Sequence, residues 1–600
     1  MAGSPVRGQT KAAWREAKKV EALVRRPGRL IVMGRQGAVI YLRVHPNGRD
    51  WSARESRSGA WHLQPWPGPG TTEGRRMGQP PWWQRGVIYQ IYPRSWMDSD
   101  GDGVGDLPGI LARLDHLTWL GVDGIWISPV YPSPGADLGY DVADYTAIDP
   151  LFGTMEDMDR LIAAAHQRGL RVLLDWVPNH TSDQHPWFLA SRSGRDDPKR
   201  AWYVWRDPAP DGGPPSNWVG YAGQSAWCWD EATGQYYYHF FLDAQPDLNW
   251  RNPEVQSAML DTLRFWLERG VDGFRIDVLS LLVEDDQLRD NPPNPEFRDG
   301  DWPYLRQHFR YTHDQPETRE LAMRIRKVVD EYGDDKVLLA ELVVPIEALA
   351  AYHGTDGHGI QVPLNFELLE ADWNARGIAA FVDRYLAVLP PGAWPNWVLG
   401  NHDTPRVASR LGPAQARVAA MLLLTLPGTP ILYYGDEIAM TDVPVAPDQV
   451  RDPVAALIPG RGRDPERSPM RWDDRPGAGF TTGTPWLPLG DPAVTVAAQR
   501  DDPGSMLTLH RRLLALRHDS PALSAGAYEP VQADGDVLAY LRTGDDGRWL
   551  VALNLGPGTG RLDLAIRGRV ELATTPDRDG ERVEDGLDLA GDQGVVVRLD

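Results

Sequence analysis

Three acidic residues, Asp277, Glu341 and Asp403, follow short apolar segments that lie far apart in the chain. A carboxylate in such a place is costly to desolvate without a partner, so three of them favour one shared site over three separate helix caps or ion pairs. They are accompanied by no Ser-x-Gly elbow, no Cys nucleophile and no His-x-x-x-His zinc spacing. Convergent carboxylates of this kind predict the cleavage of glycosides, in which one carboxylate acts as the nucleophile and another as the proton donor.

The elements that would bring these residues together are eight short segments, each about the length of one strand: residues 87–92, 124–131, 171–177, 273–278, 337–343, 360–369, 396–400 and 430–434. Most have consecutive apolar positions, which indicate strands buried on both faces of a parallel sheet. Helical spacing appears between them, and three helices end at Gly121, Gly169 and Gly270, directly before a strand. This repetition predicts an α/β fold, the (β/α)8 barrel.

The active site of such a barrel lies at the C-terminal ends of its strands. Polar residues follow five of the predicted strands there: Asp137 and Tyr140 after the second, His180 after the third, Arg275 and Asp277 on the fourth, Glu341 on the fifth, and His402 and Asp403 after the seventh. We therefore expect these side chains to meet on one face of the barrel.

The chain divides into five expected parts: a basic N-terminal extension (1–76), the first part of the barrel (77–178), an inserted small subdomain after the third strand (179–250), the rest of the barrel (251–518) and a C-terminal antiparallel β-sandwich domain (519–600). The insertion is too long for a simple loop of a compact barrel. Residues 49–76 are rich in Pro, Gly, Ser and Arg, which predicts disorder in the extension. It is either a basic binding tail or sequence joined by the choice of start codon, and we assign it no function.

Composition limits the classes of partner. The 600 residues carry a formal net charge of −21, which disfavours nucleic acid as the main partner. No apolar run approaches the roughly 18–20 residues that cross a membrane, and no signal-peptide pattern opens the chain. These absences predict a cytoplasmic protein without a membrane partner, and the lone Cys228 excludes an internal disulfide framework.

From about residue 83 onward the chain resembles the α-amylase family of retaining enzymes that act on α-glucosides, and within it the oligo-1,6-glucosidase and α-glucosidase branch. Four motifs in the right order carry the resemblance: DWVPNH (175–180), GFRID (273–277), AE (340–341) and NHD (401–403). Two further segments resemble that branch: QPDLNW (245–250) and RSPMRW (467–472), the latter with Ser and Arg where Thr and Gln are commoner.

The resemblance implies a role for each carboxylate. Asp277 would be the nucleophile that forms a β-glucosyl ester, Glu341 the acid/base, and Asp403 the stabiliser of the distorted sugar and its developing charge. Arg275 lies two residues before Asp277 and points to the same side of the strand, so its fixed charge would keep Asp277 ionised. The carboxyl groups of Asp277 and Glu341 should then lie about 5–5.5 Å apart.

The resemblance also implies how the sugar is held. His180 and His402 would hydrogen-bond sugar hydroxyls, and Tyr140 would stack under the non-reducing glucose. Asp137 and Arg467 would pair and close the pocket behind that glucose. The site would then be a dead-end pocket that releases one glucose from a chain end.

Residues 98–106 (DSDGDGVGD) match the start of an EF-hand loop, with carboxylates at positions 1, 3, 5 and 9 and Gly at 6, but without the Glu at position 12. The resemblance implies one structural Ca²⁺, or Mg²⁺, held by the side chains of Asp98, Asp100, Asp102 and Asp106 and the carbonyl of Val104. A solvated Asx-turn is the alternative reading. No organic cofactor is expected.

The preferred function is an exo-acting retaining α-glucosidase for small α-glucosides, as a monomer or homodimer. A trehalose synthase or another α-glucosyl transferase or isomerase would use the same three carboxylates. A non-catalytic transporter-associated subunit is disfavoured, because such proteins normally carry a membrane span and lack these carboxylates. Val278, directly after the nucleophile, tilts the prediction towards α-1,6 linkages.

Overall fold

The computed structural model describes residues 25–26, 29–33, 39–43, 80–354 and 357–600. The chain divides into two compact units, Met1–Gln64 and Pro65–Asp600. The described residues of the first unit form a three-stranded antiparallel sheet of β1 (Arg25–Arg26), β2 (Arg29–Met33) and β3 (Val39–Arg43). The predicted disorder of the remaining residues up to 76 lies outside the described residues.

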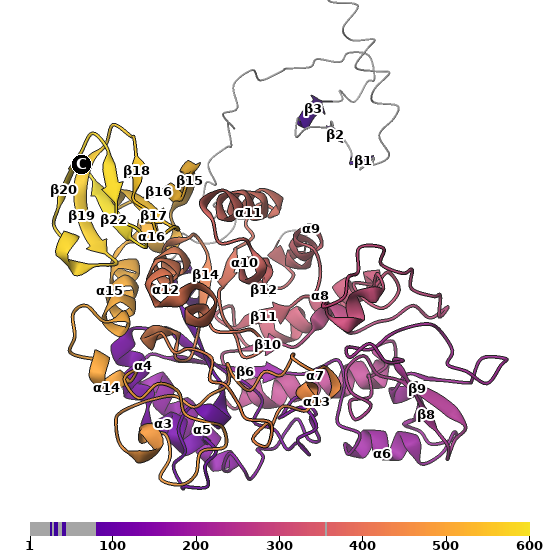
Figure 1. Ribbon diagram of the computed structural model, residues 1–600. Coiled ribbons are helices and arrows are strands. Elements are labelled where there is room, and N and C mark those ends of the chain that lie inside the picture. The colour runs from indigo at the N-terminus through magenta and orange to yellow at the C-terminus, as the bar shows by residue number, and fades with distance from the viewer. Residues whose placement is uncertain (1–24, 27–28, 34–38, 44–79, 355–356) are drawn as a thin grey trace, which may run out of the picture. The chain divides into compact units, whose positions relative to one another are not determined.

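Eight parallel strands form the barrel in the second unit (Figure 1). They are β4 (Ile88–Ile91), β5 (Gly124–Ile127), β6 (Arg171–Trp176), β10 (Gly273–Ile276), β11 (Val337–Glu341), β12 (Val362–Leu364), β13 (Asn396–Val398) and β14 (Thr429–Tyr433). Their order is β12-β11-β10-β6-β5-β4-β14-β13, and the Asn396 side chain accepts a hydrogen bond from the Asn365 amide (3.3 Å) between the two edge strands. The predicted (β/α)8 barrel is thus confirmed, with nearly complete closure.

The sixth strand is shorter than predicted. Only three of the residues 360–369 are extended, and Glu367 begins helix α10 (Glu367–Glu370). The Asn365 side chain accepts a hydrogen bond from the Glu367 amide (3.1 Å). The amide is therefore bonded to a side chain and not to a neighbouring strand, and the helix begins at this residue.

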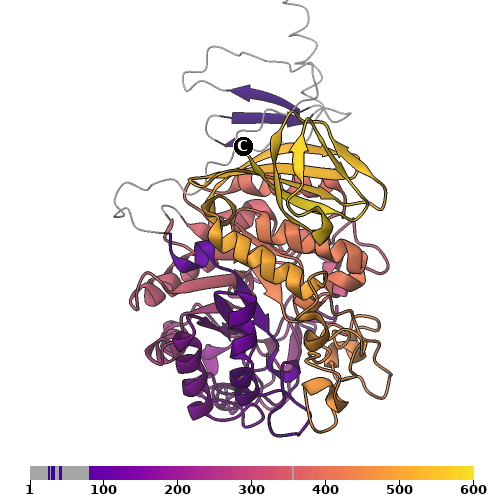
Figure 2. The same ribbon diagram turned by 90° about the vertical axis from the view of Figure 1, so that its left-hand side faces the viewer.

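Helices surround the strands, as Figure 1 and the turned view in Figure 2 show. The longest are α5 (Met155–Gln167), α7 (Pro253–Glu268), α8 (Pro316–Asp330), α11 (Ala375–Val388), α12 (Val407–Thr425) and α15 (Met506–Asp519), and α3 (Leu107–Ala112) and α4 (Leu114–Leu120) follow β4. Gly121, Gly169 and Gly270 have φ values of 97°, 77° and 102°. The predicted helix-ending glycines therefore adopt the left-handed conformation that only glycine accepts without strain.

Three long connections interrupt the barrel. The first, between β6 and α7, contains α6 (Pro186–Arg192) and an antiparallel sheet of β7 (Trp205–Arg206), β9 (Gln235–Tyr238) and β8 (Trp227–Asp230). The second runs from β10 to α8 through two short 3-10 helices, η3 (Leu279–Leu281) and η4 (Pro303–Arg306). The third runs from β14 to α15 and includes α13 (Pro453–Leu457). Only the first was predicted.

The C-terminal part is antiparallel, as predicted. Its six-stranded sheet has the order β15-β16-β17-β22-β19-β20, and a two-stranded sheet pairs β18 with β21. The strands are β15 (Ala527–Asp534), β16 (Val537–Gly544), β17 (Gly547–Asn554), β18 (Gly560–Leu562), β19 (Arg567–Ala573), β20 (Arg582–Glu584), β21 (Leu587–Leu589) and β22 (Gly594–Leu599).

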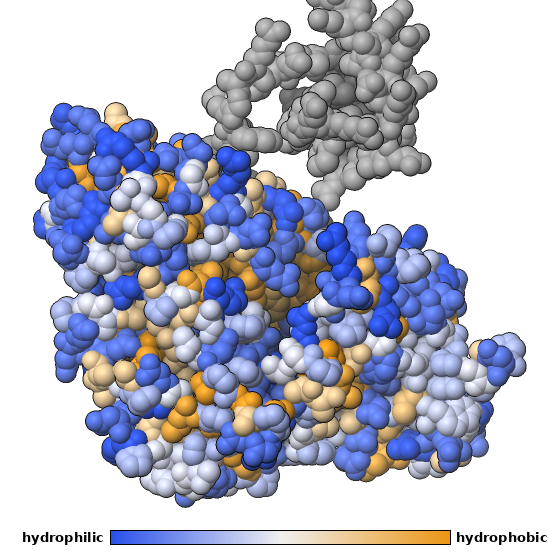
Figure 3. All heavy atoms as spheres, viewed as in Figure 1, coloured by the Kyte–Doolittle hydropathy of each residue, from blue (hydrophilic) through white to orange (hydrophobic). Residues whose placement is uncertain are grey.

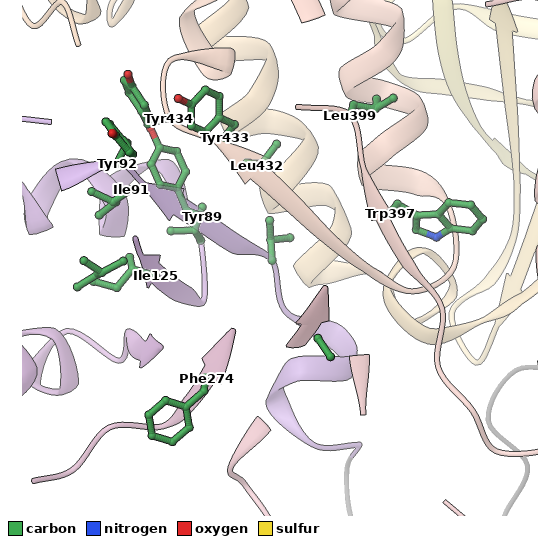
Figure 4. Packing of buried hydrophobic residues seen from close by; sticks show 14 of the residues in the cluster. Tyr89, Ile91, Tyr92, Ile125, Phe274, Trp397, Leu399, Leu432, Tyr433 and Tyr434 are labelled. Carbon is green, nitrogen blue, oxygen red and sulfur yellow. The ribbon is translucent and has the colours of Figure 1, made fainter. Parts of the chain in front are cut away.

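The barrel core is rich in aromatic residues (Figure 4). Tyr89 lies on β4 and Tyr92 directly follows it. Both lie near Tyr433 and Tyr434 at the end of β14, and all four are buried. Hydrophilic residues cover most of the face drawn in Figure 3, with hydrophobic residues scattered among them. Every helix among the described residues is too short or too polar to span a lipid bilayer. A cytoplasmic location stays a prediction.

Candidate active site

One buried guanidinium joins two of the predicted carboxylates. Arg275 Nη1 on β10 donates to Asp277 Oδ1 (2.6 Å) and to Asp175 Oδ1 (2.8 Å), while its Nη2 donates to Glu341 Oε2 at the end of β11. The Arg275 and Asp175 side chains are at most 2% exposed, and the Asp277 side chain is 8% exposed. The two strands therefore bring Asp277 and Glu341 to one cation, as the sequence predicts.

The protonation of this pair follows from its surroundings. Burial raises the pKa of both Asp277 and Glu341, and the Arg275 guanidinium acts in the opposite direction on each. The negative charge of Glu341 raises the pKa of Asp277 further. Two carboxyl groups that repel each other across one arginine favour sharing a single proton. One ionised and one protonated carboxyl is the state that retaining glycoside cleavage needs.

The third carboxylate, Asp403, is the most open of the three, with 37% of its side chain exposed. Its Oδ1 accepts hydrogen bonds from Arg467 Nη2 (2.7 Å) and Arg463 Nη1 (3.2 Å), and its Oδ2 lies 3.3 Å from His402 Nε2. Desolvation acts to raise the pKa of Asp403, but His402, Arg463 and Arg467 outweigh it and hold the pKa below its usual value. Asp403 is therefore ionised.

Tyr140 and His402 form one stacked, hydrogen-bonded unit. Their ring centroids are 5.3 Å apart with planes 5° apart, and His402 Nε2 lies 2.7 Å from the Tyr140 hydroxyl. Gln90 Nε2 lies 2.8 Å from His402 Nδ1, and burial lowers the pKa of His402 to about 3. A neutral His402 then accepts from Gln90 and donates from Nε2 to the Tyr140 hydroxyl, which donates to Asp175 Oδ2 (3.0 Å).

His180 contacts the backbone of Tyr140. Its Nε2 is 3.1 Å from the Tyr140 carbonyl and 3.0 Å from Gln245 Nε2, and burial lowers its pKa to about 4. Gln245 Nε2 also donates to Asp137 Oδ2 (3.2 Å). The neutral imidazole is thus connected through Gln245 to Asp137.

The expected pairing of Asp137 with Arg467 is wrong. Arg463 Nη2 donates to Asp137 Oδ1 (2.7 Å), whereas Arg467 Nε donates to the His402 carbonyl (2.7 Å) and its Nη2 to Asp403. The Asp452 carboxylate fixes this choice, because it accepts from Arg463 Nε (2.9 Å), Nη2 (2.8 Å) and the backbone amide (2.7 Å). Arg463 therefore bridges Asp137 and Asp403.

Sequence reasoning missed several residues of the site. Asp175 and Gln245 lie inside the quoted motifs but received no role, and Gln90 is the polar residue of the otherwise apolar strand β4. A polar side chain in a buried strand was a usable signal for Gln90. Arg463 and Asp452 lie outside every motif, so their pairing could not be read from the sequence.

The backbone directly after Asp277 is strained. Val278 has φ 35° and ψ 47°, in the left-handed region that a β-branched residue seldom occupies. The Val278 amide donates a hydrogen bond to Glu341 and acts to lower the pKa of that carboxyl.

The predicted metal loop is only partly assembled. One carboxylate oxygen each from Asp98, Asp100 and Asp106 lies within 4.8 Å of the others. Asp102 is exposed and lies outside this group, and its Oδ1 accepts a hydrogen bond from the Val104 amide (2.7 Å). The carboxylate oxygens that do meet are the hard ligands that Ca²⁺ and Mg²⁺ prefer.

Comparison with known proteins gives a consistent result. The family model described as "Alpha amylase, catalytic domain" matches residues 90–526. The "Probable alpha-glucosidase" of Rhizobium meliloti (strain 1021) is 42% identical over 511 residues, which cover 81% of this chain and 91% of that protein. The "Oligo-1,6-glucosidase" of Heyndrickxia coagulans is 37% identical over 529 residues, which cover 80% and 93%.

A solved structure is equally similar. The crystal structure of the alpha-glucosyl transfer enzyme XgtA superposes with a TM-score of 0.82 at 42% identity, over 87% of this chain and 100% of that one. Proteins named for hydrolysis and for glucosyl transfer thus resemble this chain to the same degree.

Proposed function

The chain belongs to the α-amylase family and is a glycoside hydrolase of that family, and we propose that it is an exo-acting retaining α-glucosidase. It would hydrolyse terminal α-linked glucose from disaccharides or short oligosaccharides. The observation that carries the proposal is the hydrogen bonding of both Asp277 and Glu341 to Arg275, beside the ionised Asp403.

The reaction takes two steps. In the first, the Asp277 carboxylate attacks the anomeric carbon while Glu341 gives its proton to the leaving oxygen, so the glycosidic bond breaks and a β-glucosyl ester forms. In the second, Glu341 takes a proton from water, whose oxygen attacks the anomeric carbon and frees Asp277. Asp403 would stabilise the positive charge that develops on the sugar ring in both steps.

The closed end of the pocket would come from Arg463. Arg463 is a buried cation that forms ion pairs with Asp137 and Asp403, and this group would lie behind the terminal glucose, where carboxylate and guanidinium groups can bind sugar hydroxyls. His180, His402 and Gln245 would add further hydrogen bonds, and the ring of Tyr140 would stack on the sugar. A pocket closed in this way accepts a chain end and excludes an internal residue of a polymer.

A glucosyl transferase is the second candidate, because the alpha-glucosyl transfer enzyme XgtA is 42% identical to this chain. The same β-glucosyl ester would then react with a sugar hydroxyl instead of water. The three carboxylates would act in the same way in hydrolysis and in transfer. The balance between the two reactions must therefore depend on the part of the site that binds the attacking water or sugar.

We also propose that loop 98–106 binds one structural Ca²⁺ or Mg²⁺. Asp98, Asp100 and Asp106 would supply carboxylate oxygens. Such an ion would tie the start of α3 to the end of β4 and stiffen this connection, and no step of the reaction requires it.

The test is a product analysis with maltose, isomaltose, sucrose, trehalose and p-nitrophenyl α-glucoside. Glucose released first as the α anomer, followed by NMR, supports a retaining glucosidase. Glucosyl-sugar products in place of glucose support the transferase, and release of β-glucose contradicts both. An Asp277→Asn variant is the control: it should fold with an unchanged melting temperature and lose turnover by several orders of magnitude.

A further inference from the structure

One buried amide on the first strand of the barrel has no part in the mechanism above. Gln90 lies on β4 and is fully buried. Its Nε2 lies 2.8 Å from His402 Nδ1 and 3.4 Å from Ser128 Oγ, and no donor within the described part of the chain reaches its Oε1. An apolar side chain would avoid the cost of burying this amide, so the bond to the His402 ring is what Gln90 contributes.

The position of the hydrogen on the His402 ring follows from the other edge of the ring. Nε2 of His402 lies 2.7 Å from the Tyr140 hydroxyl and 3.3 Å from Asp403 Oδ2. Asp403 is ionised, and a lone pair on Nε2 would face its negative charge. Nε2 therefore carries the hydrogen, and the lone pair of a neutral ring lies on Nδ1.

The surroundings of the ring keep it neutral. Burial lowers the pKa of His402 to about 3. The charged groups that act on the ring are one carboxylate, which opposes this effect, and three guanidinium groups, which add to it: Asp403, Arg275, Arg463 and Arg467. The titratable rings beside it, Tyr92 and Tyr140, stay uncharged because burial raises the pKa of each.

We infer that Gln90 is a positioning residue, whose amide keeps the hydrogen of the His402 ring on Nε2 and so directs the Tyr140 hydroxyl to Asp175. The Gln90 amide supplies the donor that the lone pair on Nδ1 needs. Because Nε2 donates to the Tyr140 oxygen, that hydroxyl keeps its own hydrogen for Asp175 Oδ2 (3.0 Å). The expected effect on turnover rests on the proposed function.

This series of hydrogen bonds ends beside Asp277. Asp175 accepts from the Tyr140 hydroxyl at Oδ2 and from Arg275 Nη1 at Oδ1 (2.8 Å), and the same nitrogen donates to Asp277 Oδ1 (2.6 Å). Without the Tyr140 hydrogen bond, Asp175 would compete more strongly with Asp277 for that nitrogen. Gln90 would thus act on sugar binding through His402 and on the charge of Asp277 through Asp175.

Gln90→Glu tests the placement of the hydrogen, because a carboxylate accepts hydrogen bonds and cannot donate one. The ring hydrogen should move to Nδ1, so that Nε2 presents a lone pair to Asp403 and the Tyr140 hydroxyl turns from Asp175 to Nε2. One added proton, on either the new carboxyl or the ring, restores the hydrogen at Nε2. The loss of activity should therefore be reversed by acid.

The measurement is kcat/KM for p-nitrophenyl α-glucoside, taken as the ratio of Gln90→Glu to the wild type at each pH. We expect a deficit of about tenfold at about pH 8 that shrinks to about twofold at about pH 5.5, on the two sides of the ordinary histidine pKa of about 6.5. Taking the ratio removes the acid and alkaline limits that both proteins share.

Two further variants separate this effect from packing. Gln90→Met fills similar space without a polar group, so its activity relative to the wild type should be lowered equally at every pH. Gln361 is a second buried glutamine, next to β12, and its side chain bonds to the backbone of residues 336 and 338. Gln361→Glu should lower the melting temperature, and its relative activity should not change with pH.

The His402 ring can also be observed directly, whether or not the variants fold. Its ¹⁵N chemical shifts in the wild type, assigned by comparison with His402→Asn, should show a protonated Nε2 and an unprotonated Nδ1. A protonated Nδ1, wild-type activity in Gln90→Glu, or a loss in that variant that does not vary with pH would overturn the inference. A wild-type protein that cleaves no α-glucoside would contradict the proposed function, and the ¹⁵N shifts would still decide the position of the hydrogen.

Discussion

At the residue scale, the placement of Arg275 decides how the carboxyls of Asp277 and Glu341 share a proton. Its terminal nitrogens bind Asp277 and Glu341 separately, so the guanidinium stabilises whichever carboxyl is ionised. Sequence predicted this arginine and both carboxyls, because residues two apart on a strand share a face. It could not predict the role of Asp175, which accepts from the same nitrogen as Asp277 and makes Arg275 part of a larger buried network.

The pH dependence of activity should reflect this pair. In the proposed mechanism turnover needs Asp277 ionised and Glu341 protonated, so activity should fall with acid as Asp277 gains its proton and fall with alkali as Glu341 loses its own. Burial raises both pKa values, so both limits should lie above the ordinary carboxyl values of about 3.9 and 4.3. The measurement is kcat/KM for p-nitrophenyl α-glucoside against pH.

Fluoride is a leaving group that needs no proton, so α-glucosyl fluoride should lose the alkaline limit in the bond-breaking step while it keeps the acid one. If activity on both substrates fell at the same alkaline pH, Glu341 would not be the proton donor.

At the element scale, the connection between β14 and α15 supplies both arginines that bind Asp403. Asp452 is the N-cap of α13, where its Oδ1 accepts from the Val454 amide (3.2 Å), and the same carboxylate holds Arg463. The sequence predicted Arg467 from its motif but not Arg463, because the two lie four positions apart in a loop and only the path of the chain shows which one faces Asp137. Loop geometry carries no periodicity from which such a choice could be predicted.

Asp452 should therefore act as a positioning residue. In Asp452→Asn one charged acceptor of Arg463 becomes a neutral amide, so the guanidinium is held less firmly at the place proposed for the closed end of the pocket. We expect KM for maltose to rise and kcat/KM to fall about tenfold, with a smaller change in kcat. Asp448→Asn, an exposed aspartate of the same connection, is the control and should behave as the wild type. A fall confined to kcat would contradict the assignment.

The metal loop allows a test that distinguishes its aspartates. If Asp98, Asp100 and Asp106 bind the ion, the melting temperature in millimolar Ca²⁺ should be higher than the melting temperature in the presence of a chelator. The free energy of unfolding rises by about 2.7 kcal/mol when the free ion is at 100 times its Kd. Asp98→Asn should abolish the rise, whereas Asp102→Asn should keep it, because Asp102 lies outside the group. The opposite pattern would restore Asp102 as a ligand.

At the scale of the whole molecule, the barrel and the C-terminal sheet were predictable because both have strong periodic patterns. The Gly residues that end helices marked the βα units, and alternating strands marked the sheet. What the sequence could not predict is how the two parts join. Two buried arginines, Arg517 on α15 and Arg542 on β16, contribute to that junction, and no motif singles them out.

Both arginines bind carbonyl groups at the end of helix α12. Arg517 Nη1 donates to the Leu424 carbonyl (3.0 Å), and Arg542 Nη1 donates to the Thr425 carbonyl while its Nη2 donates to the Gly526 carbonyl (3.0 Å). The last carbonyls of a helix lack partners within the helix and carry partial negative charge, so these cations satisfy them. Burial, together with the Arg517 charge, lowers the pKa of Arg542 to about 9.

Arg542→Met should therefore lower the stability of the barrel and the sheet together, and not only that of the sheet. Methionine fills much of the same space but leaves the buried Thr425 carbonyl and the part-buried Gly526 carbonyl without this donor, at a cost of about 1–3 kcal/mol each. We expect the free energy of unfolding, measured with urea, to fall by about 2–4 kcal/mol in a transition that barrel and sheet still share. Arg548→Met, an exposed residue of β17, is the matched control and should change stability by less than about 0.5 kcal/mol. Separate transitions for barrel and sheet in the wild type would show that the two fold independently, and the Arg542 contacts would then not couple them.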